Sequence, residues 1–266
     1  MTDQLGRYID TSIPFKRIVC LVPSQTALLY DLGLEHLLVG ITKFCVHPPH
    51  LKDHLAIVGG TKNIHWDSLK SLKPDIVLCN KEENTQQIVA QLETFTQVHI
   101  ADIYTLEDCY ELIQQYGVLF NVVQKGECII EQIRVSAKEY HSFLAEKTPE
   151  KVAYLIWRKP WMLAGGDTFI NHMLEVAGFD NVFKDLSRYP EVELSDIQKS
   201  AIDFLFLSSE PYPFKEKHKA ELREEFTNAE IVLVNGEFFS WYGSRLTSAF
   251  DYFKTLKLQL KSKKAD

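Results

Sequence analysis

The sequence predicts an α/β protein of two lobes, each built on a parallel β-sheet, with one long α-helix between them. Three observations predict this fold. The same order of apolar strands and amphipathic helices occurs twice along the 266 residues. The strands are continuous apolar runs, which is typical of parallel sheets that are covered on both faces. One uninterrupted helical pattern separates the two halves.

The two halves begin with matching elements. A strand at residues 17–22 precedes a helix that ends at Gly33, and a strand at residues 151–156 precedes a helix that ends at Gly178. Glycine adopts the left-handed conformation at a helix end without steric cost, so both positions favour a helix end. Each half then continues with a short helix that leads into a second buried strand, at residues 68–79 and 194–207.

The helix between the halves is predicted at residues 125–147, where apolar residues recur at three- and four-residue spacing. It would be roughly 30 Å long, enough to brace two lobes. The spacing alone also fits an ordinary surface helix, but its position between matching halves favours the connecting role. We therefore predict two Rossmann-like lobes, at residues 15–124 and 148–262, joined by this helix.

Composition excludes several classes of protein. The net charge of −7 argues against binding to nucleic acid, and no apolar stretch approaches the roughly 20 residues of a membrane span. Residues 1–14 are polar and lack the features of an export signal. Either the native start lies upstream or the protein is not exported by this route, so a cytoplasmic location stays open. The five cysteines show no paired spacing, which favours a reducing compartment.

Aromatic and cationic residues gather in the loops that follow the predicted strands. Ligands of open parallel sheets bind beyond the carboxyl ends of the strands, and loop Trp and Tyr offer broad contact to a flat ligand. Some of these side chains could instead cap the lobe cores. Arg158, Arg188 and Arg245 could meet carboxylates or amides of a ligand, although Arg158 and Arg188 could equally be solvated. The predicted ligand contacts in the cleft between the lobes are Trp161, Tyr189, Trp241, Tyr242, Arg245, His47 and Lys81. The rings of Trp161 and Trp241 are expected to be partly exposed there.

Metal and catalytic motifs are weak or missing. His47, His50 and His54 have a spacing that can gather on a metal, but two prolines interrupt the segment and no further Cys or carboxylate cluster completes it. We therefore expect no metal site and place His47 as a residue lining the cleft. The nucleophile elbow and the glycine-rich phosphate loops are absent from the sequence, so we expect a protein that is not an enzyme and carries no cofactor.

The order of these features resembles the helical-backbone class of ABC-importer solute receptors, which includes the cobalamin, haem and ferric-siderophore receptors. The resemblance runs from about Arg17 to Phe253. Its landmarks are residues 17–26, Val39-Gly-Ile-Thr42, Val58-Gly-Gly60, Leu72-Lys-Pro-Asp-Ile-Val77 and Asn181-Val-Phe183. The resemblance implies two α/β lobes on a rigid helix, a monomer, and a periplasmic or cell-envelope location.

Within that class the chain looks closest to the cobalamin receptors. Trp161 and Tyr189 stand where those receptors have aromatic walls of the binding cleft, and residues 238–241 also match an aromatic position. A tryptophan that they carry after the second strand is replaced here by Asn80-Lys81. The resemblance implies docking on a permease through one acidic residue in each lobe, with Glu82, Glu83, Glu210 and Glu216 at the matching loops and helix starts.

The predicted function is thus that of an ABC-importer receptor that binds a cobalamin-like corrinoid without chemistry. One alternative keeps the fold and changes the ligand to haem or a ferric siderophore. Another is a two-lobed enzyme of the glycosyltransferase type, which also places a cleft between α/β lobes. Fold does not decide among these functions, although the missing phosphate-binding glycines count against the transferase.

Overall fold

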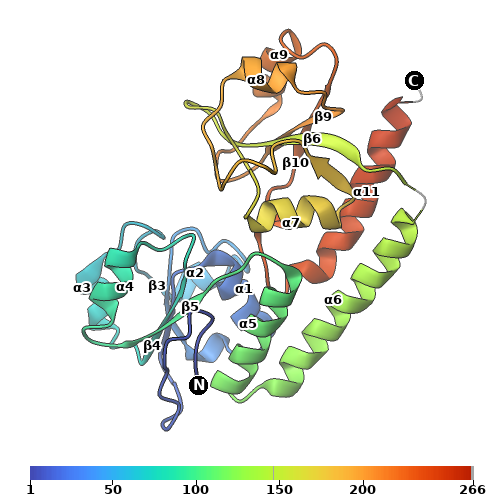
Figure 1. Ribbon diagram of the computed structural model, residues 1–266. Helices are drawn as coiled ribbons and strands as arrows, with labels where there is room; N and C mark the ends of the chain where they lie inside the picture. The colour runs from blue at the N-terminus through green and yellow to red at the C-terminus, as the bar shows by residue number, and fades with distance from the viewer. Residues whose placement is uncertain (146, 265–266) are drawn as a thin grey trace. The chain divides into compact units, whose positions relative to one another are not determined.

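The computed structural model describes residues 1–145 and 147–264, which divide into two compact units (Figure 1). The first unit, called the first lobe below, holds residues 1–134 and 241–247. The second lobe holds residues 135–240 and the chain from residue 248 onward. Each lobe is an α/β unit around a parallel sheet, which confirms the predicted fold class.

One segment lies in a different lobe from the one that the sequence predicted. Residues 241–247 fall within the predicted second lobe but pack with the first. The reason is hydrogen bonding within the first lobe. Gln25 Nε2 donates to the Tyr242 hydroxyl at 3.0 Å, and the Gly243 amide donates to Cys109 Sγ at 3.1 Å.

The first lobe is a sheet with the strand order β3-β2-β1-β4-β5, parallel throughout. Its strands are β1 (Ile18–Cys20), β2 (Leu38–Ile41), β3 (Ala56–Ile57), β4 (Ile76–Asn80) and β5 (Gln97–Ala101). Its helices are α1 (Pro23–Asp31), the 3-10 helix η1 (Glu35–Leu37), α2 (Leu51–His54), α3 (Trp66–Ser71), α4 (Gln86–Leu92) and α5 (Leu106–Leu119). Since the strands are parallel, their carboxyl ends share one edge of the sheet.

Both faces of this sheet are buried, which explains the continuous apolar strands. Val19, Val77 and Val98 belong to the core cluster that includes side chains of α3 and α4. His99 points to the opposite face, where its ring packs edge-on against Tyr116 of α5. Figure 1 shows α3 and α4 on one side of the sheet and α1 and α5 on the other. The apolar surface removed from water on the two faces is the main favourable term in folding.

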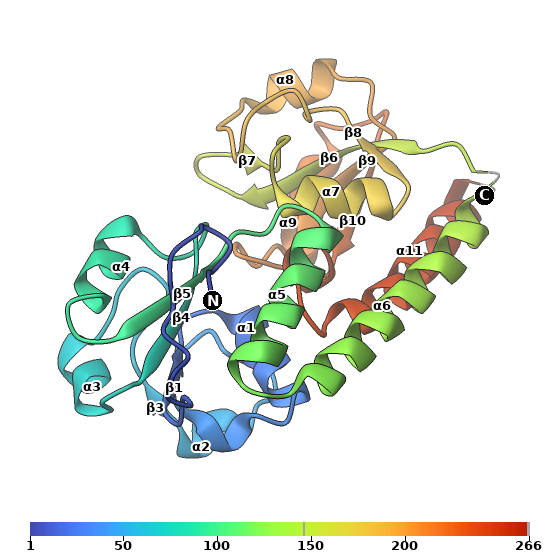
Figure 2. The ribbon, with the colours of Figure 1, turned by 60° about the horizontal axis from the view of Figure 1, so that its bottom comes forward.

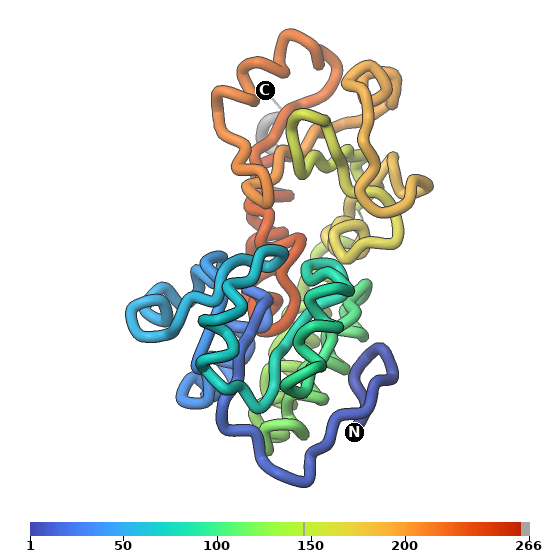
Figure 3. The backbone as a smooth tube through the Cα atoms, turned by 90° about the vertical axis from the view of Figure 1, so that its left-hand side faces the viewer, coloured from blue at the N-terminus to red at the C-terminus, as the bar shows by residue number. Residues whose placement is uncertain are grey.

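The amino-terminal residues form a small hairpin beside the outer edge of β5 (Figures 2 and 3, dark blue). Thr2 and Tyr8 form an antiparallel bridge, and Gly6 turns the chain with φ +74°. The buried carboxylate of Asp3 accepts the Ile100 amide of β5 at 3.1 Å. An edge strand with open amides invites pairing with other chains, and this hairpin covers it.

His99 of β5 should make stability depend on pH. Its ring is buried, with Nε2 2.7 Å from Gln115 Oε1, Tyr116 against the ring, and Asp3 and Arg7 as nearby charges. Burial lowers the pKa of His99 below its ordinary value of 6.5. The unfolded chain therefore takes up this proton at higher pH than the folded protein does. Stability should be greatest above pH 6.5 and fall as the pH drops below it.

Urea denaturation of the wild type and of His99→Gln, between about pH 5 and 8, measures this effect. Glutamine does not titrate, so the variant should lose less stability than the wild type on acidification. Parallel pH profiles for the two proteins would contradict the assignment.

The long helix is α6 (Val123–Leu144). The predicted range was 125–147, so the helix begins two residues before the predicted start and ends three residues before the predicted end. Residue 146 of that range lies outside the described residues. Ile133 and Tyr140 are buried on one face, as the apolar spacing predicted. Its first part belongs to the first lobe and its second part to the second.

The second lobe has the strand order β10-β9-β6-β7, with β8 pairing to β6. Its strands are β6 (Glu150–Trp157), β7 (Met162–Leu163), β8 (Phe179–Asn181), β9 (Phe204–Ser208) and β10 (Glu230–Val234). Its helices are α7 (Phe169–Val176), α8 (Leu194–Lys199), α9 (Glu216–Arg223), α10 (Glu237–Ser240) and most of α11 (Leu246–Lys264). β7 runs antiparallel to β6, unlike the predicted all-parallel sheet, because a short turn joins the two strands.

This second sheet is also buried on both faces. Ala153 and Leu155 join the core cluster that includes side chains of α8 and α9. Between them Tyr154 points to the opposite face, where its ring lies 5.3 Å from that of Phe239. In the described part of the chain, no helix is both long and apolar enough to span a bilayer.

Lys257 of α11 is a buried charge in this lobe. It is 1% exposed, and its ammonium pairs with the carboxylate of Glu150, which is 18% exposed. The ammonium also donates to the Gly178 carbonyl and lies 3.5 Å from the ring centroid of Phe179. A charge without water must be held by such partners.

Candidate functional site

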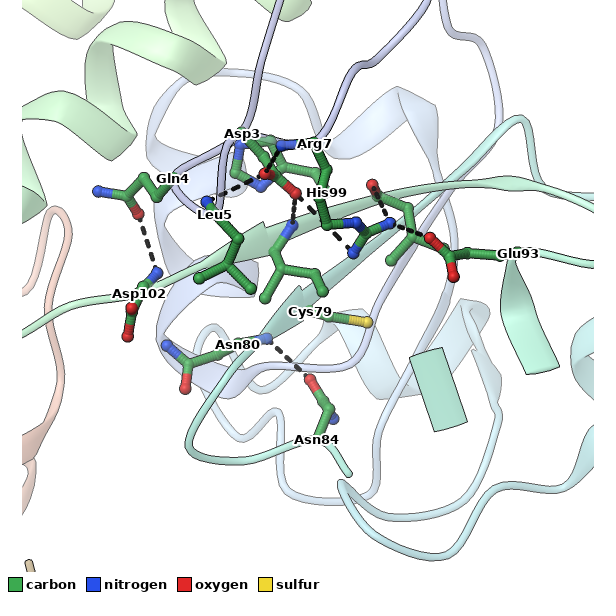
Figure 4. A network of polar contacts seen from close by, with 12 residues as sticks. Asp3, Gln4, Leu5, Arg7, Cys79, Asn80, Asn84, Glu93, His99 and Asp102 are labelled. Carbon is green, nitrogen blue, oxygen red and sulfur yellow. Dashed lines mark hydrogen bonds and ion pairs between the residues drawn. The ribbon is translucent and has the colours of Figure 1, made fainter. Parts of the chain in front are cut away.

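The loop after β4 is a tight turn built on buried Asn80, at the carboxyl edge of the first sheet. The side-chain oxygen of Asn80 accepts the amides of Glu82 at 2.7 Å and Glu83 at 3.3 Å. The Asn80 amide donates to Asn84 Oδ1 at 2.9 Å (Figure 4). Glu82 and Glu83 were predicted on an exposed loop, but this turn leaves both half-buried. Their docking role stays a prediction.

Lys81 lies in the same turn and reaches toward β5. Its ammonium donates to Asp102 Oδ2 at 2.6 Å and to the Tyr104 hydroxyl at 3.3 Å. The hydrogen bond to Asp102, with that to Tyr104, raises the pKa of Lys81. The side chain is 44% exposed, so the cation is available to an acidic or amide group of a ligand at the edge of the sheet.

Trp241 and Tyr242 were predicted as ligand contacts, with the Trp241 ring partly exposed, and the structure buries both side chains. They are 7% and 5% exposed and belong to the first lobe. The Tyr242 hydroxyl accepts from Gln25, and Gln25 Oε1 accepts from the Tyr116 hydroxyl at 2.7 Å. Burial raises the pKa of Tyr242 well above its ordinary value. The prediction of a partly exposed Trp241 ring is therefore wrong. The polar tip of Tyr242, which a ligand would otherwise satisfy, is taken up by this buried hydrogen-bond network.

His47 and Arg245 lie close to this buried segment. The His47 ring is edge-on to Trp241, with 5.6 Å between ring centroids, and Arg245 follows in the same segment. Both His47 and Arg245 are half-buried. The fold therefore brings two predicted contacts, His47 and Trp241, into direct contact within the first lobe, with His47 the more accessible of the two.

Phe44 and Val46 are candidate contacts that the sequence reasoning missed. They lie in the loop after β2 and are 50% and 40% exposed. The Lys43 ammonium is 5.1 Å from the centroid of the Phe44 ring. Two exposed apolar side chains in one loop at the carboxyl edge of the sheet, where ligands of parallel sheets bind, are candidate contacts. Their sequence signal was the apolar pair in this loop, where only His47 was singled out.

Trp161 lies in the turn between β6 and β7 of the second lobe. Its ring stacks on Phe214, with 6.3 Å between centroids and 5° between planes, and the Arg158 guanidinium lies 5.6 Å from the ring. Trp157, the last residue of β6, is 38% exposed and edge-on to Tyr212. Trp161 itself is half-buried, in agreement with the partly exposed ring that was predicted.

Tyr189 lies on a loop that Gly166 and Asp167 hold in place. The Gly166 amide donates to the Leu186 carbonyl at 2.7 Å. The Arg188 amide donates to Asp167 Oδ1 at 2.7 Å, and this bond lowers the pKa of Asp167. Arg188 has φ +60°, a conformation that costs a non-glycine residue about 1–2 kcal/mol. These bonds hold the chain in that conformation next to Tyr189, which is half-buried.

Replacing Gly166 with alanine should disturb the loop that carries Tyr189. An added Cβ would lie 2.1 Å from the Lys184 carbonyl oxygen, so backbone must move. Such overpacking usually lowers the free energy of unfolding by about 1–3 kcal/mol. Gly60→Ala is the matched control, since its Cβ would meet the exposed Phe44 ring at 3.1 Å, and that ring can turn away. Equal stability of the two variants in urea denaturation would count against the close approach.

Glu216 and Glu210, the predicted docking residues of this lobe, differ in exposure. Glu216 is exposed in the first turn of α9, where a carboxylate also complements the helix dipole. Glu210 is half-buried and accepts a hydrogen bond from the Ser240 hydroxyl. Glu216 is therefore the more accessible candidate for docking.

The histidine-rich segment does not gather on one point. His50 Nε2 and His54 Nε2 each lie 3.3 Å from Glu35 Oε1, whereas the His47 ring contacts Trp241. Within residues 1–145 and 147–264, no group of three or more His, Cys, Asp or Glu side chains is placed to hold a metal ion.

A hollow of ≈ 710 Å³ in the second lobe lies at the amino ends of strands β6 and β9. It is lined by Lys151, Asp203, residues 197–202 and residues 225–229. Lys151 is the second residue of β6, and its amide donates to Asp203 Oδ2 at 2.8 Å, just before β9. This hollow is thus at the amino ends of the strands, away from the edge where ligands of parallel sheets bind.

Known proteins similar to this chain are binding proteins. The chain is 26% identical over 197 residues to an uncharacterized ABC transporter substrate-binding lipoprotein of Bacillus subtilis, YvrC, a match that spans 68% of this chain and 59% of that protein. It is 22% identical over 242 residues to the vitamin B12-binding protein of Pectobacterium atrosepticum, spanning 88% of this chain and 85% of the relative.

Solved structures with the same fold include two receptors for different ligands. The periplasmic vitamin B12 binding protein BtuF of Vibrio cholerae matches with a TM-score of 0.79 at 19% identity, over 92% of this chain and 98% of that chain. The periplasmic haem-binding protein BhuT in complex with two haems matches with a TM-score of 0.80 at 21% identity, over 93% and 98%. At these identities the likeness shows the fold and leaves the ligand open.

These matches decide between receptor and enzyme. The matching family and the structural neighbours are substrate-binding receptors, which confirms the expectation of a non-enzymatic protein and leaves the glycosyltransferase alternative without support. The family model for periplasmic binding proteins matches residues 18–232, most of both lobes. The chain therefore belongs to the periplasmic binding protein family, of the ABC-importer type.

Proposed function

We propose that this protein is the receptor of an ABC importer and that its ligand is a cobalamin-like corrinoid. The loops at the carboxyl edge of each sheet are the proposed contacts. The ligand is cargo, and no cofactor is proposed.

The observation that carries this proposal is the aromatic turn of the second lobe. Trp161 is half-buried and stacks on Phe214, and Tyr189 of the same lobe is half-buried too. Large flat rings left partly in water are well suited to a flat, apolar macrocycle. Relatives named vitamin B12-binding proteins support the same ligand class.

Haem or a ferric siderophore is the second candidate, and Lys81 favours it. In the resemblance to the cobalamin receptors, Asn80-Lys81 replaces a tryptophan. The Lys81 side chain is 44% exposed at the edge of the first sheet. Ammonium groups bind the carboxylates that haem and many iron chelators carry. A structural neighbour that holds two haems supports the alternative.

The partner and the location follow from the same proposal. We infer a permease partner, approached through Glu216 of the second lobe and through Glu82 or Glu83 of the first. Surface charges of this kind act mainly on encounter and register. Relatives named as a lipoprotein and as periplasmic receptors support a cell-envelope location. The proposed form is a monomer.

A thermal-shift panel tests the ligand. The purified protein is heated with cyanocobalamin, haem, a ferric hydroxamate siderophore or UDP-glucose, the last as a negative control. A ligand at about 100 times its Kd stabilises the native state by about 2.7 kcal/mol, which is a rise in Tm of roughly 5–11 °C for a protein of this size. A rise with cyanocobalamin alone supports the corrinoid. A rise with haem or the siderophore alone transfers the proposal to that ligand, and no rise with any of the three overturns it.

A further inference from the structure

The amino-terminal hairpin is bound to β5 through side chains rather than through a strand ladder. Asp3 Oδ2 accepts the Ile100 amide at 3.1 Å, and the Gln97 side chain exchanges two hydrogen bonds with the backbone of Asp10, at 2.7 and 3.0 Å. Gln4 Oε1 accepts the Asp102 amide at 3.1 Å (Figure 4). The hairpin therefore follows the whole outer edge of β5, from its first residue to the residue just past its end.

The hairpin is itself well ordered by internal bonds. The Asp3 side chain is fully buried and its Oδ1 accepts the amides of Leu5 at 3.0 Å and Arg7 at 2.9 Å. The Asp3 amide donates to the Arg7 carbonyl, and the Ile9 amide donates to the Met1 carbonyl. A carboxylate that accepts several backbone amides fixes the path of the chain around it. Gln4, next to Asp3, is thereby held in a defined place.

Gln4 joins the end of β5 to the start of α5. Its Oε1 accepts the Asp102 amide, and its Nε2 donates to the Asp108 carbonyl at 2.8 Å. Asp102 is the residue whose carboxylate accepts the Lys81 ammonium at 2.6 Å. A continuous set of hydrogen bonds thus runs from the amino-terminal hairpin, through the backbone of Asp102, to the cation at the edge of the first sheet.

We propose that Gln4 is a positioning residue of the receptor, which holds Asp102 so that Lys81 is presented to the ligand. This inference rests on the proposed function for its consequence in binding. A lysine has four rotatable side-chain bonds, and holding it in one place before the ligand arrives reduces the entropy lost on binding. The group that Lys81 would meet is an acidic or amide oxygen of the ligand.

Competitive acetylation with acetic anhydride tests the positioning without any ligand. The extent of modification of Lys81 is measured by mass spectrometry relative to Lys199, an exposed lysine of the second lobe. In Gln4→Ala the relative labelling of Lys81 should rise about threefold or more. Complete loss of an exposed ion pair, worth up to about 1 kcal/mol, would leave the amine unbonded about fivefold more often, which sets the scale of this rise. Asp102→Asn removes the partner itself and should raise labelling at least as much.

Gln97→Ala is the matched control, since it removes two hydrogen bonds from the same hairpin at the other end of β5. It should leave the labelling of Lys81 at the wild-type level. Unchanged labelling in Gln4→Ala, or an equal rise in Gln97→Ala, overturns the proposal, the latter because a general loosening of the hairpin would then suffice.

Binding of cyanocobalamin, measured by calorimetry, supplies the second arm. If the wild type binds it, Gln4→Ala and Asp102→Asn should weaken Kd by roughly threefold or more with Gln97→Ala unchanged, and equal Kd values for wild type and Gln4→Ala overturn the role in binding. If the wild type does not bind cyanocobalamin, the corrinoid proposal fails, and the labelling result by itself still decides whether Gln4 positions Lys81.

Discussion

Replacing Glu150 with glutamine is expected to lower the free energy of unfolding by about 3–5 kcal/mol, the usual cost of removing one partner from a buried ion pair. The substitution keeps the shape of the side chain and removes its charge. Lys257, only 1% exposed, then loses this carboxylate, while its contacts with the Gly178 carbonyl and the Phe179 ring carry no compensating charge. Urea denaturation followed by circular dichroism measures the loss, which corresponds to a fall in Tm of roughly 6–20 °C.

Two further variants give this result its meaning. Adding Lys257→Met to Glu150→Gln removes the buried charge as well, and it should recover much of the stability, because apolar groups of similar volume often replace a buried pair at little cost. Asp180→Asn removes the exposed pair with Lys184 and should cost less than about 1 kcal/mol. A Glu150→Gln protein as stable as Asp180→Asn would show that the buried ammonium does not depend on its carboxylate.

Replacing Trp161 with alanine is expected to weaken binding of the ligand found in the thermal-shift panel by about 1–3 kcal/mol, the scale of burying one large apolar side chain. In Kd this is roughly 5- to 150-fold. The ring lies in the β6–β7 turn, stacked on Phe214 and packed against the core of the second lobe, but it stays partly exposed, so a ligand can cover the surface that remains. Isothermal titration calorimetry measures the change.

Trp161→Phe and Trp66→Ala are the controls for this prediction. Phenylalanine keeps an aromatic ring on Phe214 and should retain most of the affinity. Trp66 is half-buried and packs against the core cluster of the first lobe, as Trp161 does against that of the second. Its loss should therefore lower stability to a similar extent, while Kd stays near the wild-type value. Unchanged affinity in Trp161→Ala, with a loss of stability like that of Trp66→Ala, would make Trp161 a core residue.

The repeated order of elements was readable from the chain because it depends on local physics. Apolar runs of strand length and helices that end at glycine are properties of short segments, and Gly33 and Gly178 do adopt positive φ at the predicted helix ends. The antiparallel β7 was not predicted, since a two-residue strand leaves almost no apolar pattern to find.

The environment of each candidate side chain was much harder to predict. Trp161 and Trp241 look alike in sequence, each a tryptophan in a loop after a strand, yet one is half-buried in the second lobe and the other is buried in the first. Burial of a loop residue is set by whatever segment happens to pack on it, and such partners are far away in the chain. Glu82 and Glu83 were misjudged in exposure for the same reason, because the turn on Asn80 draws them inward.

The sequence by itself determined the fold class, the long helix and the kind of protein, because these follow from periodicity, composition and a resemblance carried by the order of motifs. Only the tertiary structure decided which side chains meet. It placed residues 241–247 in the first lobe, since Gln25 and Cys109 hold Tyr242 and Gly243 there. It also brought Gln4 to Asp102, 98 residues away, and a contact of that separation leaves no trace in local pattern because both residues are ordinary polar side chains until the fold joins them.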